Sequence, residues 1–475
     1  MRGNSIRKEN IRQFYNNLAP RRQRFKKINW YYHRDLEKYY RFLIPEGQSV
    51  LEIGCGTGDL LASLNPSRGA GIDISDKMID IARQKYPHLQ FLVMDAEDIT
   101  LDDKFDYIII SGTIGDLEDI QKSLSQLRKV VHRRTRIIID YYNYFWQPVL
   151  RLGEWLKLKI PQLYQNWLPS QEIVNLLFLS DFETIKGHNR MLFPIYIPLV
   201  SSFINGFLAK LPLLKHFSID RFIIARPLYK EGIREEYSCS VIVPARNEKG
   251  TVEQIVLRTP EMGNKMEIIF VEGYSKDGTR EEIERVIKKY PEKNLKLIKQ
   301  DKGVGKADAV HLGFEAASGD VLMILDADFS VSPEDLPKFY SNLVSGQGEF
   351  ITGTRLVYAI EKQAMRFLNL AANYLFGRMF TWLLEHHVTD TLCGTKVLWR
   401  QDYLKIKENR DYFGDFDPFG DFELLFGAAK LNLRHIEIPV RYHARVYGQT
   451  NISRWRHGVL LLQMCWIAFR KLKTV

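Results

Sequence analysis

The sequence predicts a protein of two α/β domains, each built on a parallel β-sheet. Apolar strand-like segments alternate with helix-like stretches from residue 49 to residue 140, and the same alternation restarts at residue 240 and runs to residue 326. This rhythm is typical of parallel strands joined by crossover helices. The length of 475 residues also exceeds what one hydrophobic core usually organises. We therefore expect two halves, each with its own core and its own ligand.

Five strands are predicted in the first half and four in the second. They are residues 49–53, 69–74, 91–94, 107–110 and 136–140, followed by 240–244, 267–272, 295–300 and 321–326. The domains are expected at residues 1–228 and 238–475, joined by a short polar linker over 229–237. With 45% hydrophobic and 26% charged residues, the composition is that of a globular protein and excludes a disordered or fibrous chain.

The net charge of +10 is concentrated at the two ends of the chain. Residues 1–46 hold twelve Lys/Arg against four Asp/Glu, and residues 441–475 hold seven against none. We expect a basic helical segment at the N-terminus and a basic amphipathic segment at the C-terminus. These ends suit nucleic acid, anionic lipid or a phosphorylated substrate, or else they are solvated faces. Residues 1–46 lack the apolar centre of a secretory signal, so we expect a cytoplasmic protein, peripheral on the inner face of the cell membrane.

Residues 191–209 form an uncharged stretch of 19 residues, which is long enough in principle to span a bilayer. Pro194 and Pro198 would break helical hydrogen bonds in its first half. We therefore expect a lid over an apolar substrate or a monotopic surface segment, with domain packing as the alternative. Residues 148–160 place apolar side chains at helical spacing with basic residues between them, which suits either an interfacial helix or core packing.

The first domain carries a glycine-rich loop directly after its first predicted strand. An acid and three glycines stand there at alternate positions: Glu52, Gly54, Gly56 and Gly58. Glycines at this place allow a tight turn, a close approach of backbone to ligand and the start of a helix. Asp73 ends the second predicted strand, where a carboxylate can accept hydrogen bonds from both hydroxyls of a ribose, and Asp95 follows the third.

In this spacing, residues 47–145 resemble the class I S-adenosylmethionine (SAM)-dependent methyltransferases, which are built on a Rossmann-like sheet. The resemblance implies that the glycine loop holds the methionine part of SAM, Asp73 the ribose and Asp95 the adenine. Dinucleotide binding is the competing interpretation, and glycines that only close a turn are a third. Residues 111–113 are expected to border the methyl acceptor. Tyr141, Tyr142 and Tyr144 either line an acceptor pocket or serve packing, and no base can be identified.

The second domain carries several polar motifs at predicted strand ends. They contain Pro244, Glu248, Glu272, Asp277, Lys306, Asp326 and Asp328. In this order, over residues 238–455, they resemble glycosyltransferase family 2, whose members have the GT-A (nucleotide-diphospho-sugar transferase) fold. The resemblance implies a nucleotide-sugar donor, with Pro244, Glu248, Glu272 and Asp277 around its nucleotide. Residues 272–275 read Glu-Gly-Tyr-Ser where many relatives read Asp-Asp-Gly-Ser, which leaves a UDP-sugar and a GDP-sugar both open.

Asp326 and Asp328 are the predicted metal ligands, and Lys306 and Asp326 are expected to contact the donor. Two carboxylates on one short loop can hold a hard divalent cation, Mg²⁺ or Mn²⁺, which neutralises the diphosphate of a nucleotide-sugar as it leaves. An isolated Asp-x-Asp loop is more often solvated, and it is the accompanying motifs that favour a metal here. Ser330 stands where relatives commonly have a Gln, so further metal ligands are not predicted.

Residues 352–355, 390–396 and 445–451 resemble the branch of the family that is similar to dolichol-phosphate-mannose synthase. Arg441 and Arg445 are predicted to stabilise the charge of the leaving diphosphate, with helix capping as the alternative. Asp421 lies where many members carry the acid that deprotonates a hydroxyl acceptor. If the acceptor is a polyprenyl phosphate, its oxygen is already anionic, and Asp421 would only orient groups.

Together these motifs predict a bifunctional enzyme. We expect inverting, metal-dependent transfer of a sugar to a polyprenyl phosphate or a glycan, with Asp328, Asp421 and Arg445 in catalytic roles. We also expect SAM-dependent methyl transfer to an acceptor of a polysaccharide or glycolipid pathway. One alternative is a catalytically silent methyltransferase-like domain that binds substrate or membrane. Another is RNA methylation through the basic ends, which the glycosyltransferase half disfavours, so no nucleic-acid partner is predicted.

Overall fold

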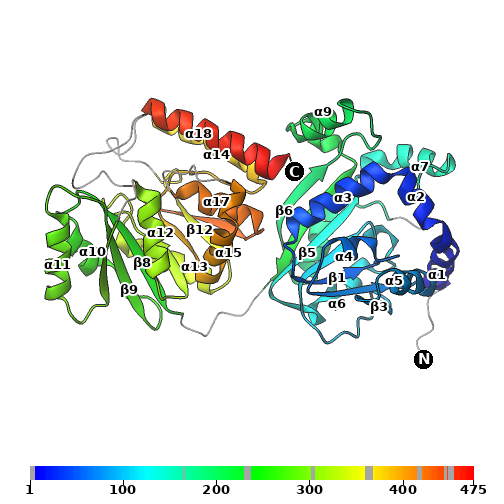
Figure 1. Ribbon diagram of the computed structural model, residues 1–475, viewed down its shortest axis with the longest axis horizontal. Coiled ribbons are helices and arrows are strands. Elements are labelled where there is room, and N and C mark those ends of the chain that lie inside the picture. The colour runs from blue at the N-terminus through cyan, green and yellow to red at the C-terminus, as the bar shows by residue number, and fades with distance from the viewer. Residues whose placement is uncertain are drawn as a thin grey trace. The chain divides into compact units, whose positions relative to one another are not determined.

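The computed structural model describes residues 6–163, 166–228, 237–300, 305–358, 367–413, 420–442, 447 and 454–474. The chain divides into two compact units: unit 1 comprises residues 1–230 and 474–475, and unit 2 comprises residues 231–473 (Figure 1). Each unit is an α/β domain with a seven-stranded sheet, so the two predicted α/β domains are confirmed. The expected linker over 229–237 lies outside the described residues except for Tyr237.

Unit 1 has the strand order β3-β2-β1-β4-β5-β7-β6. Its strands are β1 (Ser49–Ile53), β2 (Arg68–Asp73), β3 (Gln90–Val93), β4 (Phe105–Ser111), β5 (Val131–Tyr142), β6 (Phe182–Arg190) and β7 (Asp220–Pro227). The five predicted strands run parallel to one another, but β7 pairs antiparallel with both β5 and β6. The expected parallel sheet is therefore a mixed one. Strand β6 was not predicted, because this edge strand contains Lys186, His188 and Asn189 and therefore shows no continuous apolar run.

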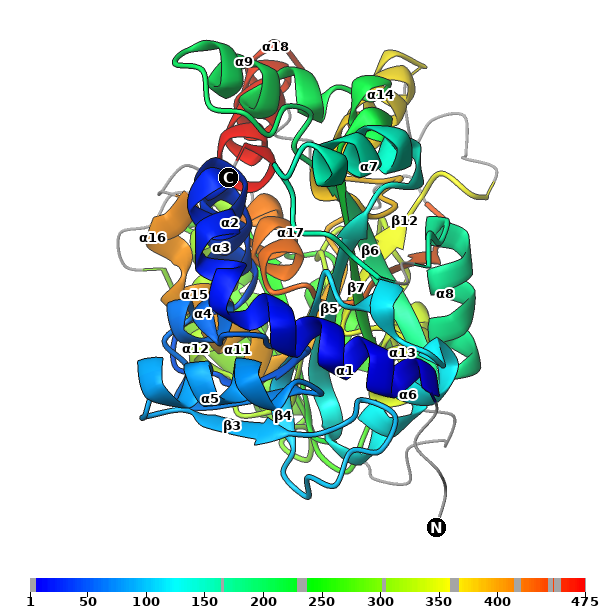
Figure 2. The same cartoon turned by 90° about the vertical axis from the view of Figure 1, so that its right-hand side faces the viewer.

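Nine α-helices accompany this sheet in the described part of unit 1. They are α1 (Ile6–Leu18), α2 (Arg22–Ile28), α3 (Trp30–Leu43), α4 (Asp59–Ser63), α5 (Asp76–Lys85), α6 (Ile120–Gln126), α7 (Gln147–Trp155), α8 (Ser170–Leu179) and α9 (Val200–Gly206). The basic segment predicted to be helical forms α1, α2 and α3. Both views place α7 and α9 at the same end of unit 1 (Figures 1 and 2).

The central strands of unit 1 are buried on both faces. Leu51 and Ile108 pack into the core on one face of the sheet, and Val50 and Ile109 pack into the core on the other. This two-sided burial explains why the parallel strands read as nearly continuous apolar runs. Because β1, β2, β3 and β4 run in the same direction, their carboxyl ends meet at one edge, where a ligand site is expected.

Unit 2 has the strand order β10-β9-β8-β11-β13-β12-β14. Its strands are β8 (Cys239–Ala245), β9 (Met266–Glu272), β10 (Leu295–Lys299), β11 (Val321–Ile324), β12 (Phe350–Thr354), β13 (Lys396–Trp399) and β14 (His435–Pro439). The four predicted strands are parallel, whereas β13 runs antiparallel to β11 and β12. This sheet is mixed as well. The reversal brings the segment that precedes β13 to the edge where β8 and β11 end.

The described helices of unit 2 lie on and beside this sheet. They are α10 (Val252–Arg258), α11 (Thr279–Lys289), α12 (Lys306–Ala316), α13 (Leu336–Val344), α14 (Phe367–Leu384), α15 (Arg400–Glu408), α16 (Arg410–Phe413), α17 (Asp421–Lys430) and α18 (Arg454–Ala468). Two cores line the two faces, one containing Ile242 and Leu322 and the other Val241 and Met323. Alternate residues of one strand thus serve opposite faces.

No helix among the described residues has both the length and the hydropathy needed to cross a bilayer. Residues 191–209 form an irregular segment followed by α9, which has seven residues. Helix α7 ends at Trp155, and none of its residues is buried. Core packing was therefore the wrong alternative for α7, since its apolar side chains lie at the surface.

Candidate functional site

The glycine-rich loop of unit 1 connects β1 to α4. Its three glycines have positive φ angles of +71° at Gly54, +52° at Gly56 and +74° at Gly58. A Cβ atom on Gly54 would lie 2.3 Å from the Thr113 hydroxyl oxygen, and one on Gly56 would lie 2.7 Å from the guanidinium carbon of Arg22. The left-handed backbone at all three positions, and the Thr113 side chain beside Gly54, therefore favour glycine here.

The three acids predicted to serve the cofactor lie at or just after the carboxyl ends of β1, β2 and β3 and line one cavity: Glu52, Asp73 and Asp95. Asp73 accepts hydrogen bonds from the backbone N–H groups of Gly56 and Ser75, each at 2.8 Å. The second-strand acid is therefore bonded to the glycine loop itself. This arrangement brings the loop and the ribose-binding candidate into one rigid element.

The N-terminal helix α1 contacts one of these acids, Asp95, and two further acids of the cavity, which the sequence did not predict. The Lys8 ammonium lies 2.6 Å from the Asp95 carboxylate and 2.8 Å from that of Glu97. The Tyr15 hydroxyl donates to Asp116 at 2.5 Å. Some of the basic charge that suggested an external partner is thus used inside unit 1. The only sequence signal was the excess of basic residues before the first strand.

The cavity of unit 1 has a volume of about 300 Å³. Ser111, Gly112 and Thr113 border it, as expected, and of the three candidate tyrosines it is Tyr142 that lines it. Beyond the glycine loop, three apolar side chains from α7 and the neighbouring loops also line the cavity: Leu150, Ile160 and Pro194. The cavity therefore runs from the cofactor motifs toward the elements that carry exposed apolar side chains.

Desolvation raises the pKa of several carboxyl groups in this cavity. The pKa of Glu52 rises to about 8, and those of Asp116 and Asp140 rise to about 6. The pKa of Asp73 is raised for the same reason, although two backbone N–H groups oppose the shift. Asp140, which the sequence did not single out, accepts a hydrogen bond from the buried Tyr40 hydroxyl. The cavity is thus rich in carboxyl groups that a positive charge would help to ionise.

In unit 2, the residues predicted to surround a nucleotide gather at the carboxyl ends of β8 and β9: Pro244, Glu248, Glu272 and Asp277. The Glu248 N–H donates to the Thr279 hydroxyl at 2.9 Å, and the Thr279 N–H donates to Asp277 at 3.0 Å. Glu272 is buried and accepts from the Ser275 N–H at 2.5 Å. These bonds join the two loops into one structure at the sheet edge where nucleotides bind in α/β folds.

Asp326 and Asp328 follow β11, and Asp326 is paired with a lysine. The Lys306 ammonium lies 2.6 Å from the Asp326 carboxylate. Desolvation opposes the charged form of Lys306, but the Asp326 and Asp421 carboxylates outweigh it and raise the lysine pKa. A Cβ atom on Gly394 would lie 1.9 Å from an Asp326 oxygen and 2.6 Å from the Lys306 nitrogen. The backbone at Gly394 therefore packs directly on this ion pair.

Across the described residues, no group of three or more His, Cys, Asp or Glu side chains is placed to hold a metal ion. Asp326 and Asp328 would thus contribute two carboxylates, and a cation would take its other ligands from water or phosphate oxygens. That donor set is common for Mg²⁺ at phosphate sites. The residues fit a hard cation, with Lys306 as a competing positive charge at Asp326.

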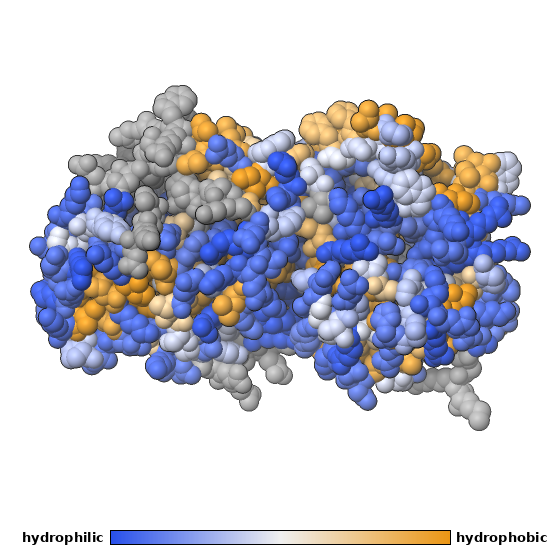
Figure 3. All heavy atoms as spheres, viewed as in Figure 1, coloured by the Kyte–Doolittle hydropathy of each residue, from blue (hydrophilic) through white to orange (hydrophobic). Residues whose placement is uncertain are grey.

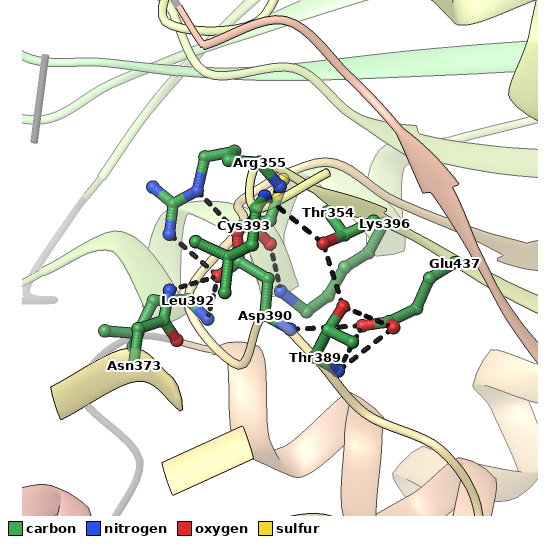
Figure 4. Close-up of polar contacts among 10 residues, drawn as sticks. Thr354, Arg355, Asn373, Thr389, Asp390, Leu392, Cys393, Lys396 and Glu437 are labelled. Carbon is green, nitrogen blue, oxygen red and sulfur yellow. Dashed lines mark hydrogen bonds and ion pairs between the residues drawn. The ribbon is translucent and has the colours of Figure 1, made fainter. Parts of the chain in front are cut away.

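A buried polar network surrounds the segment 390–396 (Figure 4). Asp390 has no exposed side-chain surface and accepts from the Arg355 guanidinium at 2.6 and 2.8 Å. It also accepts from the Asn373 amide at 3.0 Å. Glu437 accepts from the backbone N–H groups of Thr389 at 2.9 Å and Asp390 at 3.2 Å. These bonds fix the segment that carries Gly394.

The same segment positions Asp421, the predicted base. The Lys396 ammonium donates to the Asp421 carboxylate and to the Cys393 carbonyl, both at 2.6 Å, and the Lys396 and Asp421 side chains are nearly inaccessible. Gly394 and Lys396 therefore connect the Asp326 loop to Asp421 through one short segment. The sequence indicated the motif but not these contacts.

Arg445 and nearly all of the motif 445–451 lie outside the described residues. The described Arg441 has its guanidinium 5.6 Å from the centre of the Tyr358 ring. The predicted role of both arginines at a diphosphate stays a prediction.

Replacing Asp390 by Ala should lower the stability of unit 2 by about 3–5 kcal/mol, because the Arg355 guanidinium, only 12% exposed, would lose its carboxylate. The free energy of unfolding in urea measures this. Glu334→Ala is the matched control, because its ion pair with Arg258 is at the surface and contributes at most about 1 kcal/mol. Equal losses in the two variants would contradict a structural role for the network.

Each α/β domain gathers one set of predicted ligand-binding residues at the carboxyl ends of its parallel strands. Residues 44–178 match the family model for a methyltransferase domain, and residues 240–406 match that for glycosyl transferase family 2. The chain therefore contains a methyltransferase domain followed by a glycosyl transferase family 2 domain, which confirms the predicted pairing.

Curated relatives match the two halves separately. Dolichol-phosphate mannosyltransferase of Pyrococcus furiosus is 36% identical over 120 residues, covering 25% of this chain and 33% of the relative. Glycosyltransferase AglD of Haloferax volcanii is 27% identical over 239 residues, covering 48% and 37%. Demethylmenaquinone methyltransferase of Chlorobaculum tepidum is 28% identical over 138 residues, covering 26% and 56%. The chain thus spans between a third and just over half of the length of these relatives.

Proposed function

We propose that this protein is a bifunctional enzyme. Unit 2 transfers a sugar from a UDP- or GDP-sugar to a polyprenyl phosphate or a glycan, with inversion at the anomeric carbon. Unit 1 transfers a methyl group from SAM to an acceptor of the same polysaccharide or glycolipid pathway. The observation that carries the proposal is that residues far apart in the sequence converge at one sheet edge in each unit, where Asp73 bonds the glycine loop and Gly394 packs on the Asp326–Lys306 pair.

The polar groups of unit 2 suit a donor with a diphosphate. Asp326 and Asp328 would hold a divalent cation, which supplies charge neutralisation for the departing nucleotide diphosphate. Lys306 adds a further positive charge at the same place. Asp421, held by Lys396, either accepts the proton of a hydroxyl acceptor or orients an acceptor that is already anionic. Arg441 and Arg445 are proposed to contact the diphosphate.

The polar groups of unit 1 suit SAM, which supplies an electrophilic methyl group when bound. The glycine loop leaves room where a Cβ atom would clash, and the cavity carries several acids against a ligand with two positive charges. Glu52 and the loop would hold the methionine part, Asp73 the ribose and Asp95 the adenine. For Asp95, Lys8 must share or release the carboxylate.

The affinity of unit 1 for SAM should rise between about pH 5 and pH 8. The raised pKa values of Glu52, Asp116 and Asp140 mean that the ligand-free cavity holds extra protons in this range. A cationic ligand favours the ionised carboxylates, so binding releases protons and strengthens as pH rises. Titration calorimetry in buffers of different ionisation enthalpy measures both effects. A constant affinity with no proton release would contradict the assignment.

Exposed apolar side chains on two contacting helices of unit 2 support a lipid-linked acceptor and a membrane surface as partner. On α18, Val459, Leu462 and Trp466 are exposed at helical spacing, and on the neighbouring α14, Tyr374 and Leu375 are exposed. Two basic residues that are not buried follow α18: Arg470 and Lys471. Such a combination suits the headgroup region of an anionic membrane. We propose that the protein works on the cytoplasmic face of that membrane.

The competing function makes unit 1 a silent adaptor that binds substrate or membrane. Calorimetric titration of the whole chain with S-adenosylhomocysteine, and then with UDP and GDP with and without Mn²⁺, separates the two. Binding of S-adenosylhomocysteine together with Mn²⁺-dependent binding of one nucleotide supports the bifunctional enzyme. Nucleotide binding alone supports the adaptor, and binding of neither ligand class contradicts both.

A further inference from the structure

The surface of unit 1 carries an apolar collar, which we define as the exposed apolar side chains of residues 145–158 and 195–217. Six consecutive residues of the collar, 195–200, are all exposed. Their sequence is Ile-Tyr-Ile-Pro-Leu-Val, without a charged residue. Leu199 is 85% exposed and Trp155 78%. In Figure 3, hydrophobic surface gathers over α9 at this end of unit 1. A run of this length normally has a function at the surface.

The collar is an ordered structure whose polarity is inverted. Ser201 is fully buried, accepts from the Ile197 N–H at 2.6 Å and donates to the Ile195 carbonyl at 2.8 Å. The Asn205 amide oxygen accepts from the backbone N–H groups of Leu192 and Phe193, each at 2.9 Å. The side chains of Ser201 and Asn205 thus form hydrogen bonds with backbone groups of the collar, while apolar side chains of the same segment are exposed. This pattern suits contact with an apolar medium.

The two segments of the collar contact each other. The Trp146 indole N–H donates to the Phe217 carbonyl at 2.6 Å, and the rings of Phe145 and Phe217 lie 5.1 Å apart, edge to face. Asn143 donates to the carbonyls of His216 and Ser218, each at 2.9 Å. The collar is therefore one connected surface, held by hydrogen bonds at its base.

The charge around the collar identifies its partner. Residues 191–217 contain no acid, and residues 144–163 contain only Glu154, which pairs with Lys159 at 2.6 Å. Arg151 and Lys157 are exposed beside the apolar side chains. Basic groups next to exposed Trp, Phe and Leu side chains match an anionic headgroup region over acyl chains.

We infer that the collar docks unit 1 on an anionic lipid bilayer, with the cavity opening beside the docked surface. Three half-buried apolar residues line the cavity: Leu150 on α7, and Ile160 and Pro194, which adjoin the two collar segments in the sequence. The consequence, which rests on the proposed methyl-transfer function, is that the methyl acceptor is carried by a membrane lipid. An acceptor of this class would reach the cavity without leaving the bilayer.

Flotation of the whole protein with vesicles tests the docking. The wild type should float with phosphatidylcholine vesicles that contain phosphatidylglycerol, and less with pure phosphatidylcholine or at high salt. The triple variant Trp155→Glu, Leu199→Glu, Phe203→Glu should lower the partition coefficient about tenfold for each side chain. The control variant Leu257→Glu, Leu404→Glu changes exposed leucines of unit 2 and should float like the wild type.

Equal flotation of the triple variant and the wild type would overturn the inference, as would a wild type that floats with neither vesicle. If the wild type does not float but elutes as a dimer, and the triple variant elutes as a monomer, the collar would instead be assigned to contact with a second copy of the chain. Binding of S-adenosylhomocysteine is measured on the same samples. If the wild type does not bind S-adenosylhomocysteine, the methyl-transfer proposal is rejected. Flotation tests the collar independently of that result.

Discussion

Replacing Asp326 by Asn should lower glycosyl transfer by at least about 100-fold. The neutral amide would remove the charge that faces Lys306 and a divalent cation, and it would leave the lysine beside Gly394 without its carboxylate. Initial rates of sugar transfer at saturating Mn²⁺ measure the loss. The effect should fall mainly on the maximal rate, because the cation acts most strongly on the charge that develops as the diphosphate leaves.

Two controls separate this effect from a loss of folding. Asp335→Asn changes an acid of the same unit whose partner, Lys338, lies at the surface, and it should retain full activity. Binding of S-adenosylhomocysteine to the Asp326→Asn variant should equal that of the wild type, because unit 1 has its own core. Retained sugar transfer in the Asp326→Asn variant would remove Asp326 from the metal site.

Replacing Gly54 by Ala should weaken the binding of S-adenosylhomocysteine at least about tenfold. The residue has a φ angle of +71°, and the new methyl group would overlap the Thr113 side chain, so the loop must shift away from the cavity. Left-handed backbone with a Cβ costs about 1–2 kcal/mol, and steric overlap adds a similar amount. Titration calorimetry measures the affinity, and sugar transfer by unit 2 should not change.

Gly47→Ala is the matched control for this variant. Gly47 has a φ angle of +76°, but a Cβ atom there would meet no neighbour within 4 Å. Its replacement should cost about 1 kcal/mol of stability through backbone strain alone and leave the affinity unchanged. Wild-type affinity in the Gly54→Ala variant would show that the loop does not contact the ligand.

The strands of the first sheet that carry ligand residues were predictable, and the reason is local. Strands β1, β2 and β4 are parallel and mostly buried on both faces, so each reads as a short apolar run bounded by turn residues. The acid or glycine that follows such a run is then placed at the ligand edge by the strand direction alone. The same logic located Asp326 and Asp328 after β11.

Five strands of the two sheets were not predicted in this way: β6, β7, β12, β13 and β14. Edge strand β6 alternates polar and apolar residues irregularly, and β13 has only four residues. Their antiparallel pairing depends on partners elsewhere in the sheet, which no local period encodes.

The sequence by itself determined the two domains, the glycine loop, the positions of Glu52 and Asp73, and the motif 390–396, because these follow from short-range patterns of strand, turn and charge. Only the tertiary structure decided that Lys8 pairs with Asp95, 87 residues away, and that Lys396 pairs with Asp421, 25 residues away. It also decided that residues 195–200 lie outside the core. Such pairings and exposures depend on how whole elements pack, since an apolar run has the same local pattern whether protein or lipid covers it.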